Sequence, residues 1–336
     1  MTDIKTTSGT DAVPAGPSGG APATGAAAPP GSPPGTPSAA AAAPLPVRRR
    51  GEWLVFVLRN KKVIGGGGVV LAFLLFGLLS PLFLEHGPRD RFIPQERRAE
   101  APSTDFWLGT TRFGEDVFTQ LAYGVRSTFL VAVLAALIAA IIGMTVGFLA
   151  GYRGGFVDEL LMMVTNVVLV LPVFIILVVV SSYANEIPAF DFNRLTQAVV
   201  IGLFSWPWVA RAVRAQTLSL RSRDFVDLAR LTGVGTLSIV RKEIAPNMGS
   251  YLVMVFVLLF AGAILFAAAL DFLGLGPSGG MSLGLMLNFS REWSALHLGH
   301  WWWFIPPGVA ITAITGAAYI TNVGLDEVFN PKLREM

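Results

Sequence analysis

The sequence contains no cysteine and few charged residues. The absence of cysteine excludes disulfides, thiolate metal sites and cysteine nucleophiles. Asp, Glu, Lys and Arg make up 14% of the 336 residues, whereas a soluble protein carries about 25%. Since 53% of the residues are hydrophobic and the mean hydropathy is +0.60, much of the chain is expected to lie in a solvent other than water. The basic residues flank apolar runs and form no single stripe, which argues against nucleic-acid binding.

Aromatic residues are absent from residues 1–46, which hold 10 of the 22 prolines together with many Ala, Gly and Ser residues. A segment of this composition cannot bury enough apolar surface to offset the entropy of ordering. It also lacks the charged start and the continuous apolar core of a signal peptide. We predict that residues 1–46 form a disordered tail without a core function.

Six apolar runs approach the roughly 20 residues that a helix needs to cross a bilayer. Runs of this length and continuity indicate helices and not the alternating strands of a barrel. The fourth run is the weakest, because Pro207 interrupts it and Arg211 and Arg214 end it. The sequence therefore predicts an all-α, polytopic membrane protein with six transmembrane helices. The runs are 63–83, 128–150, 160–181, 198–215, 251–270 and 303–321.

The orientation of these helices follows from the distribution of Lys and Arg, which favour the cytoplasmic side. The side that holds both termini carries 17 basic residues, and the opposite side carries 8. Both termini are therefore expected in the cytoplasm. Trp301, Trp302 and Trp303 precede the last run on the outer side and are expected to anchor it in the headgroup layer.

A polar segment, "DFVDLARLTGVGTLSIVRKEIAPN" (224–247), separates two of the most apolar runs. Phe225, Leu228, Ala229 and Thr232 have the spacing of one narrow helix face. Gly233 is a suitable C-terminal break for that helix.

A second short helix is expected to follow the break at Gly233. Thr236 would be its N-cap, and Pro246 would push the preceding residue out of helical geometry and separate the helix from the next span. The apolar face of this segment is too small for a core of its own. The residues alone leave open whether lipid or a protein partner covers it.

The segment resembles the signature of bacterial ABC-importer permeases, in which Glu-Ala-Ala precedes a Gly and a later Leu-Pro. Asp227, Leu228 and Ala229 stand at the first three positions, then Gly233, and Ala245 and Pro246 close the pattern. Further stretches make residues 50–336 similar to the dipeptide/oligopeptide/nickel branch, DppC/OppC type. They are "FWLGTTRFGEDVFTQLAYGVRSTFLV" (106–131), "AGYRGGFVDELLM" (150–162), "SWPWVARAVRAQTLSLRSRDFVDLAR" (205–230), "FLGLG" (272–276) and "FIPPGVAI" (304–311).

This resemblance implies a type I ABC-importer permease fold and a non-enzymatic subunit of the bacterial plasma membrane without a cofactor. The expected partners are a homologous permease in a heterodimer, two cytoplasmic ATP-binding subunits, an extracytoplasmic substrate-binding protein and the lipid bilayer. The expected parts are the tail 1–46, a first helix with an outer loop (47–127), a five-helix core (128–325) and a cytoplasmic tail (326–336). Residues 216–247, the coupling segment, would contact the ATPase through Phe225, Asp227, Leu228, Ala229, Arg230, Gly233, Ile244 and Pro246.

Asp271 is the other candidate site residue, because a carboxylate near the outer end of a span is costly if it faces lipid. It should therefore face the bundle interior or water. One hypothesis is that it lines the outer mouth of the translocation path and meets a cationic group of the cargo. The alternative is a capping or interfacial role at the helix end.

Peptides are the cargo that the resemblance favours, and oligosaccharides or nickel chelates are the alternatives. A membrane enzyme would need clustered acid, base or nucleophile side chains at one depth, and the sequence has no such constellation. A secondary transporter would be expected to carry ionisable residues within its spans, but the six runs are almost free of charge. We therefore predict a transport subunit whose ATP is hydrolysed by separate subunits.

Overall fold

The computed structural model describes residues 59–187, 192–277 and 279–329. The predicted tail 1–46 lies outside the described residues. The described residues form helices, with an isolated bridge between Thr110 and Asp116, in agreement with the predicted all-α class. In chain order the helices are α2 (Lys61–Phe83), η1 (Gln95–Arg97), α3 (Val117–Arg153), α4 (Gly155–Val170), α5 (Val173–Glu186), α6 (Arg194–Ser205), α7 (Pro207–Arg221), α8 (Asp224–Leu231), α9 (Thr236–Ile239), η2 (Val240–Ile244), α10 (Ala245–Asn247), α11 (Gly249–Phe272), α12 (Leu283–Glu292) and α13 (Trp301–Phe329).

Four described helices, α2, α3, α11 and α13, are each long and apolar enough to cross a membrane. They match the first, second, fifth and sixth predicted runs, whose helices are thereby confirmed. Two of them extend beyond the predicted bounds, because α3 already begins at Val117 and α13 continues to Phe329.

The third predicted run, 160–181, is not one straight helix. It is divided between α4 and α5, which meet at an angle of 79°. Leu171 lies between them in an extended conformation, with ψ 134°, because the ring of Pro172 disfavours helical geometry in the residue before it.

The fourth predicted run is divided between α6 and α7 at Pro207, which is the first residue of α7. Proline is well tolerated there because the N–H it lacks would have no partner within the helix. With 12 residues, α6 alone is too short to cross a membrane, since its rise of about 18 Å is well below a hydrocarbon core of about 30 Å.

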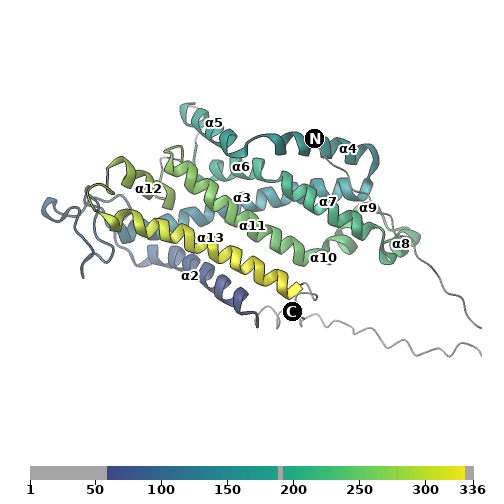
Figure 1. Ribbon diagram of the computed structural model, residues 1–336, viewed down its shortest axis with the longest axis horizontal. Coiled ribbons are helices and arrows are strands. Elements are labelled where there is room, and N and C mark those ends of the chain that lie inside the picture. The colour runs from purple at the N-terminus through teal and green to yellow at the C-terminus, as the bar shows by residue number, and fades with distance from the viewer. Residues whose placement is uncertain (1–58, 188–191, 278, 330–336) are drawn as a thin grey trace, which may run out of the picture. The chain divides into compact units, whose positions relative to one another are not determined.

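Within the described part of the chain, helix α3 packs against more of the bundle than any other helix, and it contacts α2, α6, α7 and α11 (Figure 1). Its contact with α7 is close because Gly143, Gly147 and Gly151 face that helix. A Cβ atom at Gly147 would lie 2.7 Å from the Val213 Cβ atom, which is too near for any side chain larger than hydrogen. Small residues spaced by four are the usual way for helices to approach each other closely in a membrane.

The tryptophans before the last span differ in their surroundings. Trp301 is half exposed, but Trp302 and Trp303 are buried, and Trp302 Nε1 donates a hydrogen bond of 3.2 Å to Thr110 O. The prediction that all three anchor the span in the headgroup layer is therefore wrong for Trp302 and Trp303. They instead pack α13 against the loop that precedes α3.

Candidate functional site: the coupling segment and Asp271

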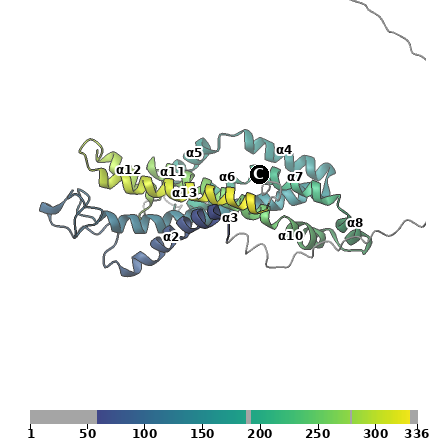
Figure 2. The ribbon, with the colours of Figure 1, turned by 60° about the horizontal axis from the view of Figure 1, so that its bottom comes forward.

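Helix α8 in the coupling segment carries charges that match its dipole. Asp224 and Asp227 occupy its first turn and Arg230 its last turn, where acidic and basic side chains respectively are favourable. Figure 2 shows α8 beyond the end of α7, and α8 contacts α9 and η2. The helix is therefore a stable short element despite its eight residues.

The apolar side chains of α8 have two different surroundings. Val226 is fully buried, and Phe225 and Ala229 are partly buried against the core, whereas Leu228 is 64% exposed. Leu228 of the predicted face is thus open to another surface, and which surface covers that face stays a prediction. The helix is rotated so that Val226 anchors it and Leu228 points away from the described core.

Gly233 ends α8 as predicted. Its φ is +76°, which is the left-handed conformation that glycine adopts without strain. The Gly233 N–H donates to Arg230 O at 3.0 Å, and the Val234 N–H donates to Ala229 O at 3.1 Å. These two bonds form a Schellman motif, which satisfies the last carbonyls of the helix.

The second half of the segment differs from the prediction at both ends. Thr236 is the first residue of α9, and the N-cap position belongs to Gly235. Ala245, before Pro246, remains helical with φ −59° and ψ −42°, so Pro246 does not push it out of helical geometry. The backbone widens to π-helical geometry over Val240–Ile244, and such a widening accommodates a proline that lacks an N–H and crowds the carbonyl four residues earlier.

The coupling segment is joined to the end of α3 by two arginines. Arg221 Nη1 donates to Tyr152 O at 3.0 Å, and Arg230 Nε donates to the Tyr152 hydroxyl at 3.4 Å. Arg230 also donates to Asp227 at 2.9 Å. The hydrogen bond with Tyr152 and the nearby Asp227 raise the pKa of Arg230 above its ordinary value, so this cation is permanent.

Buried and exposed apolar residues alternate along the segment. Val226, Ile239 and Ile244 are buried and hold the segment against the spans. Leu231 is 85% exposed and Leu237 is 76% exposed. Together with Leu228, these two leucines form what we call the outer leucine row, which no described residue covers. Exposed apolar residues on a polar segment are typical of a site that contacts protein or membrane.

Asp271 lies near the end of α11 and is 2% exposed. Arg194 Nη1 donates to its Oδ2 at 2.8 Å, Gln197 Nε2 donates to its Oδ1 at 2.7 Å, and the Ser282 hydroxyl also donates to Oδ2. These partners come from the start of α6 and from the N-cap of α12. Asp271 thus faces the bundle interior, as expected, and its charge is compensated by Arg194.

The surroundings of Asp271 are tightly packed. A Cβ atom at Gly276 would lie 1.9 Å from Asp271 Oδ1, and one at Gly284 would lie 2.4 Å from Ala268 O. Asn288 Nδ2 donates to Phe272 O at 3.0 Å. The carboxylate is therefore the centre of a polar cluster (Arg194, Gln197, Asp271 and Ser282) that fastens α12 and α6 to α11.

The structure brings the candidate residues together in two separate places. Phe225, Asp227, Leu228, Ala229, Arg230 and Gly233 lie on or directly after α8, whereas Ile244 is buried and Pro246 is exposed in the second half of the segment. Asp271 is at the other end of α11 from that segment. Within the described residues, no group of three or more His, Cys, Asp or Glu side chains could hold a metal ion.

Sequence reasoning missed the residues that hold both sites in place. Tyr152 and Arg221 carried no local signal, and Arg194 lies 77 positions from the carboxylate that it pairs with. The contact between α3 and α7 did carry a signal, because Gly143, Gly147 and Gly151 repeat at intervals of four.

Comparisons with known proteins agree with this geometry. Residues 143–335 match the model of the family described as "Binding-protein-dependent transport system inner membrane component". A peptide permease protein of Brucella suis is 35% identical over 277 residues, which cover 82% of this chain and 88% of the relative. The dipeptide transport system permease protein DppC of Bacillus subtilis is 30% identical, and the alignment covers 82% of this chain and 83% of that relative. The oligopeptide transport system permease protein OppC of Mycobacterium bovis is 30% identical, and the alignment covers 83% of this chain and 93% of that relative.

The match covers more than half of the chain, and the relatives align with most of its length. The polar segment between α7 and α11, the buried carboxylate at the end of α11 and the apolar helix α13 all lie within the matched residues 143–335. The protein is thus a multi-pass protein of the bacterial inner membrane, and it belongs to the family of binding-protein-dependent transport system inner membrane components.

Proposed function

We propose that this chain is one permease subunit of an ATP-driven peptide importer, and that its coupling segment binds an ATPase subunit. The names of the relatives support peptides as the cargo, since they are a peptide permease, a dipeptide permease and an oligopeptide permease. The observation that carries the coupling role is the outer leucine row. Leu228, Leu231 and Leu237 are exposed on a segment that Val226, Ile239 and Ile244 anchor in the core.

The contact would transmit motion through Tyr152. An ATPase that moves α8 would act on Arg230, which holds the hydroxyl of Tyr152 at the end of α3. Arg221, at the end of α7, holds the carbonyl of the same residue. A displacement of the coupling segment is therefore passed to the two helices that pack most closely by their glycines, α3 and α7.

The remaining parts of the assembly follow from the family. A homologous permease pairs with this chain as a heterodimer, two ATP-binding subunits lie on the cytoplasmic side, and a substrate-binding protein delivers cargo from outside. In this arrangement both termini and the coupling segment are cytoplasmic. The bent pair of α4 and α5 makes one crossing and the pair of α6 and α7 makes another, which gives six.

The absence of native cysteines makes the coupling role directly testable. Leu231→Cys should form a disulfide with single cysteines placed in the ATPase groove, in membranes that contain the assembled importer. The matched control is Val323→Cys, an exposed position on α13 that we expect to face lipid. Cross-linking of both positions, or of neither, would contradict the assignment.

The peptide cargo requires a separate test. The substrate-binding protein that works with this chain should carry peptides when it is purified, and mass spectrometry would identify them. Transport of those peptides should be lost when the permease gene is deleted and restored by the full-length chain. If the binding protein carries an oligosaccharide or a metal chelate instead, the assignment as an importer stands and the assignment of peptides as cargo is wrong.

Asp271 is proposed to line the outer mouth of the translocation path, where a cationic group of the cargo competes with Arg194 for the carboxylate. Support comes from the guanidinium of Arg194, whose Nε and Nη2 atoms have no hydrogen-bond partner among the described residues, so Arg194 keeps donors for another acceptor when a cationic group displaces it from Asp271. Asp271→Asn should slow the uptake of cationic peptides more than that of neutral peptides, at unchanged expression. Equal effects on both cargoes would leave only the structural role.

A further inference from the structure

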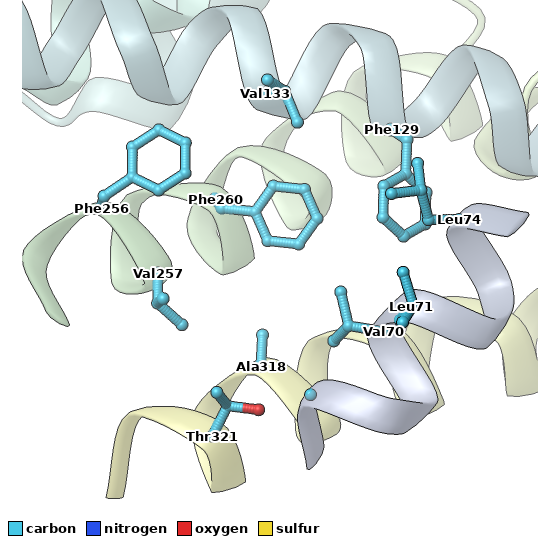
Figure 3. Close-up of a pocket in the computed structure, with 11 residues that line it drawn as sticks. Val70, Leu71, Leu74, Phe129, Val133, Phe256, Val257, Phe260, Ala318 and Thr321 are labelled. Carbon is cyan, nitrogen blue, oxygen red and sulfur yellow. The ribbon is translucent and has the colours of Figure 1, made fainter. Parts of the chain in front are cut away.

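The inner face of α2 encloses an apolar cavity (Figure 3). The cavity has a volume of about 300 Å³ and lies between α2, α3, α11 and α13. Phe256 and Phe260 of α11 point into it from one side, and Val70 and Leu71 of α2 point into it from the other. The hydroxyl of Thr321 donates to Ala317 O at 2.8 Å within α13. The lining therefore offers no free donor that would hold water.

This cavity continues into a second one along the same side of α2. The second cavity has a volume of about 520 Å³ and shares Leu74, Phe129 and Val133 with the first. Along α2 the lining extends from Gly67 to Leu78, which is about 16 Å at a rise of 1.5 Å per residue. That length is half of a hydrocarbon core of about 30 Å. We call the two cavities together the α2 groove, and it is one leaflet long.

Helix α2 packs along α13 and α3, and two of its glycines mark close contacts with these helices. A Cβ atom at Gly66 would lie 2.5 Å from Ala317 O of α13, and one at Gly77 would lie 2.8 Å from Arg126 N of α3. Between these contacts, Gly67 and Gly68 have no atom of another element within 4 Å of a Cβ position. The α2 groove lies between these two close contacts, where Gly67, Leu71 and Leu74 line it.

One cation lies at the end of the α2 groove that faces the start of α3. Arg126 lines the second cavity together with Tyr123 and Ser127, and its side chain is exposed. No ion pair or hydrogen bond of the Arg126 side chain is formed with the described residues. Side chains on a helix tilt toward its N-terminus, so the guanidinium extends toward the membrane surface at the start of α3. An unpaired arginine in a span is costly unless it reaches a phosphate or water at that surface.

We propose that the α2 groove binds one anionic phospholipid, with an acyl chain between α2 and the bundle and the phosphate on Arg126. The dimensions favour lipid over a partner helix, because a helix about 10 Å across cannot enter the cavity of about 300 Å³, whereas an acyl chain can. The charge favours an anionic headgroup, because the groove carries a cation that the described chain does not pair. The bound lipid completes the packing of α2, and this role is independent of the cargo and of the coupling segment.

Native mass spectrometry of the assembled importer, with the full-length chain, tests the proposal. After delipidation, phosphatidylglycerol should bind more tightly than phosphatidylcholine. Arg126→Gln should lower phosphatidylglycerol occupancy about tenfold, as expected for loss of a charge-assisted contact. Gly67→Leu should lower the occupancy of both lipids, because it fills the chain site. The control is Arg112→Gln, an exposed arginine of the outer loop, which should leave occupancy unchanged.

Two further experiments use the wild-type protein. Phosphatidylglycerol with a photoreactive acyl chain should label wild-type peptides from α2 and from residues 123–134, and inorganic phosphate alone should give no thermal stabilisation. The proposal is overturned if the label spreads evenly over all exposed apolar helices, or if Arg126→Gln leaves the lipid preference intact. It is also overturned if Arg126→Cys is cross-linked to the second permease, since a protein would then cover the groove.

Discussion

Gly233 and Gly235 lie two positions apart but hold different backbone conformations. Gly233 has φ +76° in the Schellman motif, whereas Gly235 has φ −66°, which any residue can adopt. Neither has an atom within 4 Å of a Cβ position. Substitutions at the two sites therefore differ in backbone strain and not in steric contact.

Gly233→Val should uncouple ATP hydrolysis from transport or release the ATPase, because a β-branched residue is disfavoured in left-handed geometry. The strain is on the order of 1–2 kcal/mol, and it acts at the end of α8. Uptake and ATPase activity would be measured in membranes with equal amounts of the inserted chain.

The controls for this prediction are Gly235→Ala and Gly233→Asn. Gly235→Ala meets neither strain nor contact, and asparagine tolerates left-handed geometry, so both should keep transport. Normal uptake by Gly233→Val, or equal loss in all three variants, would show that the turn does not couple the two processes.

The pair of Arg194 and Asp271 is the second residue-scale feature with a measurable consequence. Both side chains are largely buried, with side-chain exposures of 12% and 3%. Arg194→Met should lower stability by about 3–5 kcal/mol, because it leaves the carboxylate buried without a counter-ion. The unfolding midpoint of the purified importer in detergent would report the change.

The double variant Arg194→Met with Asp271→Asn should recover most of that loss, because no buried charge remains unpaired. A double variant that is as unstable as Arg194→Met would show that hydrogen bonding to Gln197 and Ser282, and not the charge, determines the stability of the polar cluster. The sequence predicted that Asp271 faces the interior, because a carboxylate that faces lipid has a high free-energy cost. It could not name Arg194, because no local pattern connects residues so far apart in the chain.

At the scale of elements, the close contact of α3 with α7 depends on glycines, which have no side chain to separate the two helices. A Cβ atom added at Gly143 would lie 2.6 Å from the Cβ atom of Val209, and one added at Gly147 would lie 2.7 Å from the Cβ atom of Val213. Gly147→Leu should therefore separate the two helices and reduce assembly with the partner subunits. The cost is at least the 1–3 kcal/mol that is typical of overpacking.

The comparison variant is Gly262→Leu in α11, where no atom lies within 4 Å of a Cβ position. Co-purification of the second permease should be reduced by Gly147→Leu and retained by Gly262→Leu. Full assembly of both variants would mean that α3 and α7 do not need their close contact.

Element boundaries show where sequence reasoning succeeds and where it stops. Apolar length alone predicted α2 and α11 closely, because a membrane span is recognised by composition. It did not reveal the 79° bend between α4 and α5, because hydropathy does not register the effect of Pro172 on Leu171. Helical spacing predicted one apolar face of α8 but not the burial of Val226 outside that face, because only packing against other elements determines it.

At the scale of the whole molecule, the predicted tail 1–46 is expected to be dispensable for transport. Its composition supports no core, and the part of the chain that matches the family begins at residue 143. Deletion of residues 1–46 should leave uptake within about twofold of the full chain, since such segments contribute no packing. Uptake and co-purification of the ATPase would be measured together. Loss of assembly after the deletion would contradict the prediction.

Helix α3 has 37 residues and is therefore about 55 Å long, well beyond a hydrocarbon core of about 30 Å. Both of its ends project from the core, and they have different neighbours. At one end, Asp116 caps the helix beside the loop that Trp302 holds, and at the other end Tyr152 receives the two arginines of the coupling segment. If an ATPase moves the coupling segment as proposed, the force would reach α3 at Tyr152. A rigid helix of this length would carry that displacement to its far end, so a chemical event in one compartment would be related to an opening in the other.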